Sequence, residues 1–157
     1  MEAHQRYLKM AIEEAAHGIR KREGGPFGAI IVREGKVIGK GHNCVLSTHD
    51  PTAHAEIIAI REACAREGKP HLTGAVLYTN FEPCPMCLAA IYWADIRQLY
   101  FCSGREVAEK IGFMDRHLYE EFARDPSLRE LHAAQIAVPE MDPLLEEWKG
   151  LEGKLLY

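Results

Sequence analysis

The chain has 157 residues, enough for one domain that buries roughly two-thirds of its unfolded surface. Hydrophobic residues make up 47% and charged residues 27%, which is typical of a globular protein, and no apolar run approaches the length that spans a bilayer. The formal net charge of −4 and the lack of a long basic cluster disfavour a polyanion such as nucleic acid as the substrate.

A helix and a hairpin are predicted in the first third of the chain. Residues 3–20 place apolar side chains at three- and four-residue spacings, which indicates an amphipathic helix that ends before Gly24-Gly25-Pro26. Residues 27–32 and 36–43 read as two strands, because turn-forming residues separate them. A loop over residues 44–51 follows.

Two further helices have recognisable starts. Asp50-Pro51 combines a capping residue with a helix-starting proline, so a helix begins close to His54. Pro85 suits the first turn of another helix, because the N–H that proline lacks has no partner there. We expect that helix to run from about Cys84 to about Ala94.

The remaining elements define the fold class. A helical stretch is expected at residues 116–124, and short strands are expected at residues 75–79, 98–101 and 135–138. A hairpin followed by strands that alternate with helices indicates a three-layer α/β/α sandwich around a mixed sheet, as one domain over residues 1–157. Ligands bind such sheets at the carboxyl ends of strands, and the strand at residues 75–79 ends next to Cys84.

Two short motifs supply ligands for a metal ion. Residues 54–56 read His-Ala-Glu, and residues 82–87 read Glu-Pro-Cys-Pro-Met-Cys. Structural zinc is usually closed by four protein ligands, whereas catalytic zinc keeps three and leaves the fourth position open. First-turn side chains lean toward the helix N-terminus, whose positive end favours thiolates, so both motifs can converge on one ion. We therefore predict one catalytic Zn²⁺ per chain, held by His54, Cys84 and Cys87.

Two simpler interpretations compete with a catalytic zinc. A structural zinc knuckle needs a fourth ligand, which only His42, Cys44 or an unplaced residue would supply. A thioredoxin-like redox pair does not account for the histidine and glutamate of residues 54–56. Five cysteines, two of them in the motif, disfavour a disulfide framework, so Cys44, Cys64 and Cys102 are expected to be small core residues.

With these motifs the chain resembles the cytidine-deaminase superfamily, and within it most closely the small guanine deaminases. The resemblance covers nearly the whole chain and is weakest from about residue 124 to 141. Beyond the zinc motifs, it rests on a final tyrosine and on Gly25-Pro26-Phe27-Gly28-Ala29, Asp50-Pro51-Thr52-Ala53, Ile91-Tyr92-Trp93-Ala94 and Gly112-Phe113-Met114-Asp115. It implies a cytidine deaminase-like fold and zinc as the cofactor.

The resemblance also implies roles for individual residues. In the guanine branch, Asn43 binds the purine, while Phe27 and Trp93 shape the pocket. Asp115 assists the leaving amine. Tyr157 would close the site, and a homodimer is the expected assembly.

The predicted reaction is a hydrolytic deamination. Zinc would activate the attacking water, and Glu56 would take its proton and deliver it to the ring nitrogen. Attack falls on the amine-bearing ring carbon, which is C2 if the substrate is guanine. Glu56 or Asp115 then protonates the amine, so ammonia leaves and guanine becomes xanthine. Two positions leave the fine substrate preference open. Residue 114 is methionine where some family members carry a second aspartate, and residue 81 is phenylalanine in a variable position.

Several alternatives stay open. A tRNA adenosine deaminase shares the zinc motif but must bind a polyanion, which the acidic excess of residues 140–157 disfavours. Guanosine, cytosine or an aminotriazine are further substrates that pocket volume would separate from guanine. A zinc-stabilised interaction protein is the non-enzymatic alternative, and the intact Glu56 argues against it. We expect a nucleobase substrate, no membrane partner and a cytoplasmic location, since the N-terminus lacks a signal peptide's apolar core.

The last segment of the chain, residues 143–157, is expected to dock on a surface. It carries Leu144, Leu145 and Trp148 at helical spacing and ends in apolar residues. We hypothesise that this tail is a lid that admits guanine better than guanosine, whose ribose would collide with it. The alternative is that the tail only completes the core or a dimer interface.

Overall fold

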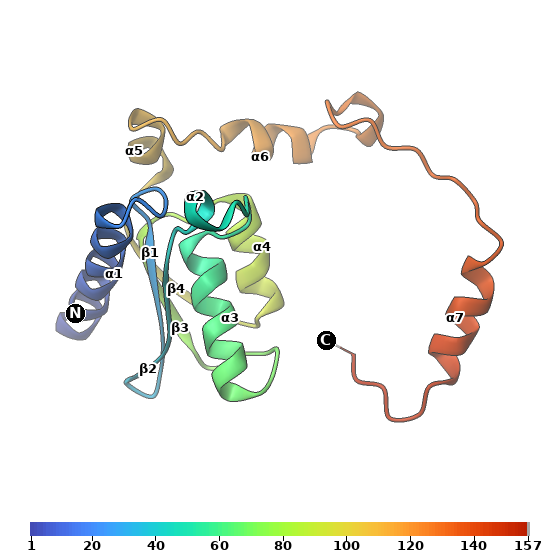
Figure 1. Ribbon diagram of the computed structural model, residues 1–157, viewed down its shortest axis with the longest axis horizontal. Helices are drawn as coiled ribbons and strands as arrows, with labels where there is room; N and C mark the ends of the chain where they lie inside the picture. The colour runs from blue at the N-terminus through green and yellow to red at the C-terminus, as the bar shows by residue number, and fades with distance from the viewer. Residues whose placement is uncertain (157) are drawn as a thin grey trace. The chain divides into compact units, whose positions relative to one another are not determined.

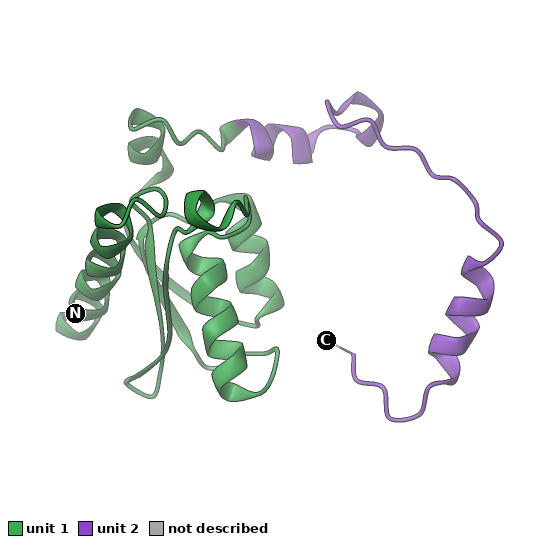
Figure 2. Cartoon of the chain, viewed as in Figure 1, with its two compact units in different colours: residues 1–116 green, residues 117–157 purple. Residues whose placement is uncertain are grey.

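The computed structural model describes residues 1–156, so the predicted role of Tyr157 falls outside the described residues. The chain divides into two compact units, residues 1–116 and residues 117–157 (Figures 1 and 2). Within residues 1–156, no helix combines the length and the apolar character that crossing a membrane would require.

Unit 1 is built around a mixed sheet that, among the described residues, has four strands. These are β1 (Gly28–Arg33), β2 (Lys36–His42), β3 (Val76–Phe81) and β4 (Gln98–Ser103), in the order β2-β1-β3-β4. β1 runs antiparallel to both β2 and β3, whereas β3 and β4 are parallel. The predicted hairpin turn is confirmed: Glu34 and Gly35 both have positive φ, which suits the tight turn between two twisted strands.

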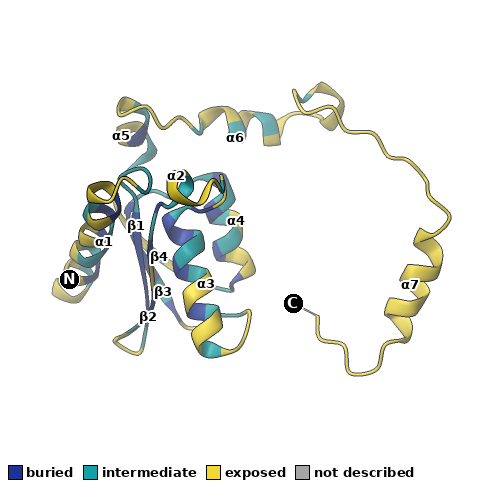
Figure 3. Ribbon diagram, in the orientation of Figure 1, coloured by how far each residue is buried: buried dark blue, intermediate teal, exposed yellow. Residues whose placement is uncertain are grey.

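Helices cover both faces of this sheet. α1 (Glu2–Arg20) packs on one face, and α3 (Ala55–Glu67) and α4 (Pro85–Trp93) pack on the other (Figures 1 and 3). Because side chains alternate along a strand, Ile30 joins the apolar cluster with α1 and Ile31 joins the cluster with α3. The predicted three-layer α/β/α sandwich is confirmed.

Two glycines bring α3 into backbone contact with β2. A Cβ atom at Gly39 would lie 2.4 Å from the carbonyl oxygen of Ala59, and one at Gly41 would lie 2.6 Å from that of Ala55. Any side chain at either position would therefore push the helix off the sheet. This close packing fixes the first turn of α3 beside the end of β2.

Three segments differ from the sequence prediction. The predicted loop at residues 44–51 contains a short helix, α2 (Val45–Thr48), and a further helix, α5 (Arg105–Lys110), was not predicted. The predicted strand at residues 135–138 is wrong, because these exposed residues pair with no other strand among the described residues. Isoleucine and valine favour a strand only where a neighbouring backbone is present to pair with it.

Unit 2 has no core of its own. It contains most of α6 (Arg116–Ala123), which confirms the predicted helix, a 3₁₀ turn (Pro126–Leu128) and α7 (Met141–Gly150). None of its described residues is buried (Figure 3). The predicted helical spacing in the tail is confirmed by α7, whose apolar side chains remain exposed. They include Leu144, Leu145 and Trp148.

Candidate active site

The two zinc motifs lie at the starts of two helices. His54 is the N-cap of α3 and Cys84 is the N-cap of α4, and both have extended backbone, with ψ of 156° and 168°. Pro85 occupies the first helical turn, as predicted. β3 leads directly into α4, so both helix N-termini converge at the carboxyl end of the parallel strands, where ligands bind in such folds.

The three predicted ligands lie at the separations that a zinc ion requires. Nδ1 of His54 is 3.6 Å from Sγ of Cys84 and 3.5 Å from Sγ of Cys87. A tetrahedral ion with bonds of about 2.3 Å to sulfur and about 2.0 Å to nitrogen keeps those two atoms roughly 3.5 Å apart. These three side chains therefore fit a zinc ion with little rearrangement.

The ligand set leaves one coordination position open. Within the described part of the chain, the metal-ligating group around His54, Cys84 and Cys87 includes no fourth histidine, cysteine or acidic residue. His42 and Cys44, the candidates for closing a structural site, belong to a separate group. Three protein ligands and one open position are typical of catalytic zinc.

The two thiols of this site have pKa values shifted in opposite directions. A hydrogen bond donated by Cys87, followed by the contact with His54, lowers the pKa of Cys84 to about 4 despite burial. The pKa of Cys87 is raised, because its proton bridges to Cys84 and because the thiol is buried. A divalent cation would stabilise both sulfurs as thiolates, and the N-termini of α3 and α4 add positive potential.

Glu56 projects into the interior beside the ligands. It lies in the first turn of α3 with 6% of its surface exposed, and its Oε2 accepts a hydrogen bond from the Cys87 thiol at 3.4 Å. Burial is the main cause that raises the pKa of this carboxyl. Most helix glutamates are solvated, so this placement favours a chemical role over a surface role.

The Asn43 side chain is held with its amide nitrogen available. Asn43 is buried directly after β2, and its Oδ1 accepts hydrogen bonds from the backbone N–H groups of Gly25 and Val45. Since both partners are donors, the oxygen must face them, and the Nδ2 amide keeps its two hydrogens for another acceptor. The next residue, Cys44, donates its N–H to the carbonyl of Ala53, which links this loop to the segment before His54.

Phe27 belongs to an aromatic cluster in unit 1. Its ring makes edge contacts with Phe113 at 4.8 Å and with Phe81 at 5.2 Å between centroids. Asn80 fixes the backbone on both sides of Phe27: its Oδ1 accepts from the following N–H, and its Nδ2 donates to the preceding carbonyl. The sequence analysis did not identify Asn80 as a supporting residue. A polar residue at the end of an apolar strand was the feature that could have indicated it.

Asp115 lies near the metal ligands of its own chain, whereas Trp93 lies far from them. Asp115 is half-buried, and one of its oxygens has no hydrogen-bond partner among residues 1–156. Burial and then the nearby Cys84 thiolate raise the pKa of this carboxyl. Trp93 is 67% exposed at the far end of the nine-residue helix α4. At about 1.5 Å per residue, this end lies roughly 12 Å from the first turn. The fold therefore brings Asp115, but not Trp93, toward the ligands of the same chain.

The predicted core position is wrong for Cys102 and Cys44, whereas Cys64 packs against the edge of the apolar cluster beneath α3. Cys44 and Cys64 are half-buried and Cys102 is exposed, and all five cysteines of the chain are free thiols. The neighbouring apolar residues in the sequence did not show which side of a helix, strand or loop each thiol would occupy.

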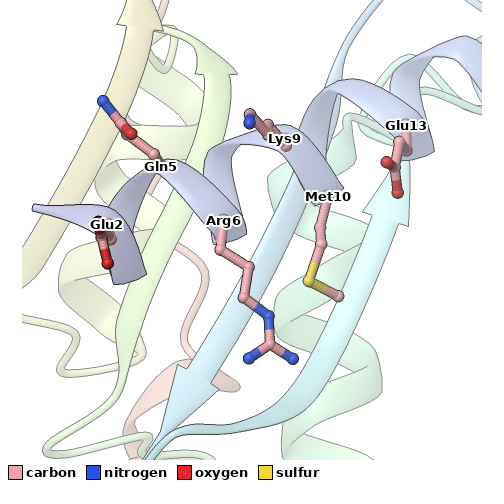
Figure 4. A pocket seen from close by; sticks show the side chains of 6 residues that line it. All are labelled: Glu2, Gln5, Arg6, Lys9, Met10 and Glu13. Atoms are coloured by element: carbon pink, nitrogen blue, oxygen red, sulfur yellow. The ribbon is translucent and has the colours of Figure 1, made fainter.

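A surface depression lies away from the metal ligands. All of its lining residues come from one side of α1, so it is a groove along a single helix with no metal-ligating motif (Figure 4). The lining side chains are Glu2, Gln5, Arg6, Lys9, Met10 and Glu13.

Comparison with known proteins identifies the family. Residues 1–103 match the cytidine and deoxycytidylate deaminase zinc-binding region. The chain belongs to this family of zinc-binding deaminases. It is 39% identical to the guanine deaminase of Bacillus subtilis over 154 residues, which covers 98% of this chain and 99% of that one.

Solved structures and a second relative agree with this placement. The crystal structure of the Bacillus subtilis guanine deaminase superposes with a TM-score of 0.93 and 39% identity, covering 98% of each chain. A tRNA-specific adenosine deaminase from Aquifex aeolicus is 47% identical over 95 residues, which is 60% of this chain and 62% of that one. The likeness to the guanine deaminase therefore extends over unit 2, whereas this tRNA deaminase matches only part of the chain.

Proposed function

We propose that this chain is a zinc-dependent guanine deaminase, which converts guanine and water to xanthine and ammonia. The observation that carries the deaminase chemistry is the three-ligand group with the buried Glu56 beside it. The choice of guanine rests on the likeness to the Bacillus subtilis enzyme over nearly the full length of both chains.

Glu56 and Asp115 carry out the proton transfers of the proposed reaction. A bound zinc ion would supply Lewis acidity to the attacking water. Glu56 takes the proton of that water and passes it to the ring nitrogen next to the carbon under attack. Asp115, with its unpartnered oxygen and raised pKa, is suited to protonate the departing amine. The products are xanthine and ammonia, so atoms and charges balance.

Asn43 and Phe27 hold the base in this proposal. Asn43 donates from its Nδ2 amide to an acceptor on the purine edge, because its oxygen already serves Gly25 and Val45. Phe27, supported by its aromatic neighbours, packs against the ring.

Replacing Asn43 by aspartate isolates the donated hydrogen bond. The variant keeps an oxygen for the N–H groups of Gly25 and Val45 but loses the amide hydrogens, so stability and zinc content should stay near those of the wild type. We expect kcat/KM for guanine to fall by about 10- to 200-fold, because the purine acceptor loses its partner. Steady-state kinetics, metal analysis and thermal unfolding check this, and an unchanged kcat/KM would remove Asn43 from base recognition.

A homodimer is part of the proposal. Trp93 is distant from the ligands of its own chain, so a contribution to a pocket would have to come from a second copy. The exposed apolar side of α7 also needs a surface to cover it, because unit 2 supplies no core. A cytoplasmic location fits five cysteines that form no disulfide.

The functional assignment is tested by ammonia release across a substrate panel. The panel contains guanine, guanosine, cytosine, an aminotriazine and a tRNA anticodon hairpin, all assayed with the zinc-loaded full chain. We expect guanine to show the highest kcat/KM. Faster turnover of the tRNA hairpin would overturn the guanine assignment, and no turnover of any substrate by zinc-loaded protein would favour the interaction protein.

The same panel tests whether residues 143–157 act as a lid within a single functional domain. In a chain that lacks residues 154–157, we expect the preference for guanine over guanosine to fall, since the ribose no longer collides with the tail. If the unfolding temperature falls while the ratio of the two catalytic efficiencies stays constant, the tail is structural and the lid proposal is wrong.

A further inference from the structure

A second group of metal-ligating side chains lies in unit 1, apart from the three proposed zinc ligands. Glu23 follows α1, His42 ends β2, and Cys44 precedes α2. One ligand atom from each of the three lies within 4.8 Å of the other two. Imidazole, carboxylate and thiolate are the three ligand types that zinc accepts in proteins, whereas a thiolate disfavours magnesium and calcium.

The backbone holds these three residues together. The carbonyl oxygen of Glu23 accepts hydrogen bonds from the N–H groups of Leu46 and Ser47, which ties it to the first turn of α2. The ring of His42 lies over Gly18, where a Cβ atom would come within 2.6 Å of Cδ2. The group is therefore set by packing and backbone hydrogen bonds and does not depend on flexible surface side chains alone.

His42 also has the outer support that metal-binding histidines usually have. Its Nε2 is 2.5 Å from Oε2 of Glu23, while its Nδ1 is 3.4 Å from Oε2 of Glu14. Glu14 is itself held by Lys40, at 2.8 Å. A carboxylate on the second ring nitrogen orients the imidazole and raises its basicity toward a metal on the first.

From this arrangement we propose a second zinc-binding site, formed by Glu23, His42 and Cys44. On binding, the Cys44 thiol loses its proton to solvent, and zinc replaces the proton between His42 Nε2 and Glu23, so that a neutral His42 carries its proton on Nδ1, facing Glu14. Zinc then forms bonds to sulfur, nitrogen and oxygen. A tetrahedral ion holds its nitrogen and oxygen ligands roughly 3.4 Å apart, so Glu23 must move outward. Its side chain is 27% exposed, against 15% for His42, and can make that shift.

This site is weaker than the one at His54, Cys84 and Cys87. It offers one thiolate in place of two, and the ion must displace two existing hydrogen bonds, one between His42 and Glu23 and one from the Cys44 thiol to the His42 carbonyl. Zinc uptake by the full chain should therefore occur in two steps as free zinc rises, with the catalytic position filled first.

Equilibrium dialysis against buffered zinc, with metal analysis of the protein, tests the proposal without an activity assay. We expect two zinc ions per chain for the wild type and one for Cys44→Ala and Cys44→Ser. Cys64→Ala is the matched control, because its half-buried thiol belongs to neither metal-ligating group of the described residues, and it should retain both steps. Glu14→Gln should keep the second step but need about 10- to 100-fold more free zinc.

Two outcomes would overturn the second site. Uptake that stops at one zinc in the wild type, or a second step that persists in both Cys44 variants, contradicts the proposed ligands. Failure here is distinct from failure of the deaminase assignment, because the first uptake step and the ammonia assay depend on His54, Cys84 and Cys87. Thermal unfolding of each variant confirms that its uptake curve belongs to folded protein.

Discussion

Turnover of guanine is expected to fall by about 10²- to 10⁴-fold in Glu56→Gln, because a positioned acid–base group typically contributes that much. Glutamine nearly matches the shape of the buried glutamate, and residue 56 is not one of the three metal ligands, so the substitution changes neither the packing nor the ligand set. Zinc content and unfolding temperature should therefore stay close to those of the wild type. Single-turnover kinetics, metal analysis and thermal unfolding of the same samples measure these three properties.

The matched control for this variant is Glu62→Gln on the same helix. Glu62 is exposed and accepts a hydrogen bond from the backbone N–H of Lys40, which a glutamine oxygen can also accept. It should retain wild-type turnover. If Glu56→Gln turns over guanine as fast as Glu62→Gln does, Glu56 takes no part in proton transfer.

Cys87→Ala is expected to lose both the catalytic zinc and measurable activity. Cys87 is completely buried, and its sulfur is 3.5 Å from Nδ1 of His54, so the variant lacks one of three ligands. The unfolding temperature of the variant should not rise at zinc concentrations that, in the wild type, fill only the site at His54, Cys84 and Cys87. In the wild type it should rise, because a ligand that binds only the folded state stabilises it.

Cys102→Ala serves as the control for Cys87→Ala. Its thiol is exposed on β4 and belongs to neither metal-ligating group of the described chain, so zinc content and activity should not change. Full deaminase activity in Cys87→Ala protein that metal analysis shows to be free of zinc would end the zinc mechanism.

Local signals in the sequence were sufficient for the metal ligands. Pro85 marks the start of α4, directly after Cys84. Asp50-Pro51 predicted a helix close to His54, but these two residues form a turn in which Oδ1 of Asp50 accepts a hydrogen bond from the Thr52 N–H. α3 begins only at Ala55, with His54 as its N-cap. The turn-forming residues at positions 33–35 separated the first two strands in the prediction, and the observed antiparallel pairing of β1 with β2 confirms this hairpin. These features depend on neighbours within a few residues, so they can be read without a structure.

Features that depend on distant partners could not be read in this way. Asn80 supports the backbone around Phe27 from 52 residues away, and Glu23 meets His42 from 19 residues away. The strand predicted at residues 135–138 failed for the same reason, since strand formation requires a partner that no local pattern specifies.

The glycines of β2 have a mechanical consequence for catalysis. At Gly39 and Gly41 no side-chain layer separates strand from helix, so α3 cannot slide along the sheet without its carbonyls colliding with the strand. Shear motion, in which packed side chains accommodate small displacements, is thereby blocked at this interface. Glu56, on the first turn of α3, moves only with the sheet. Any opening that exchanges xanthine for guanine must therefore hinge in connecting segments and leave the acid–base group in place.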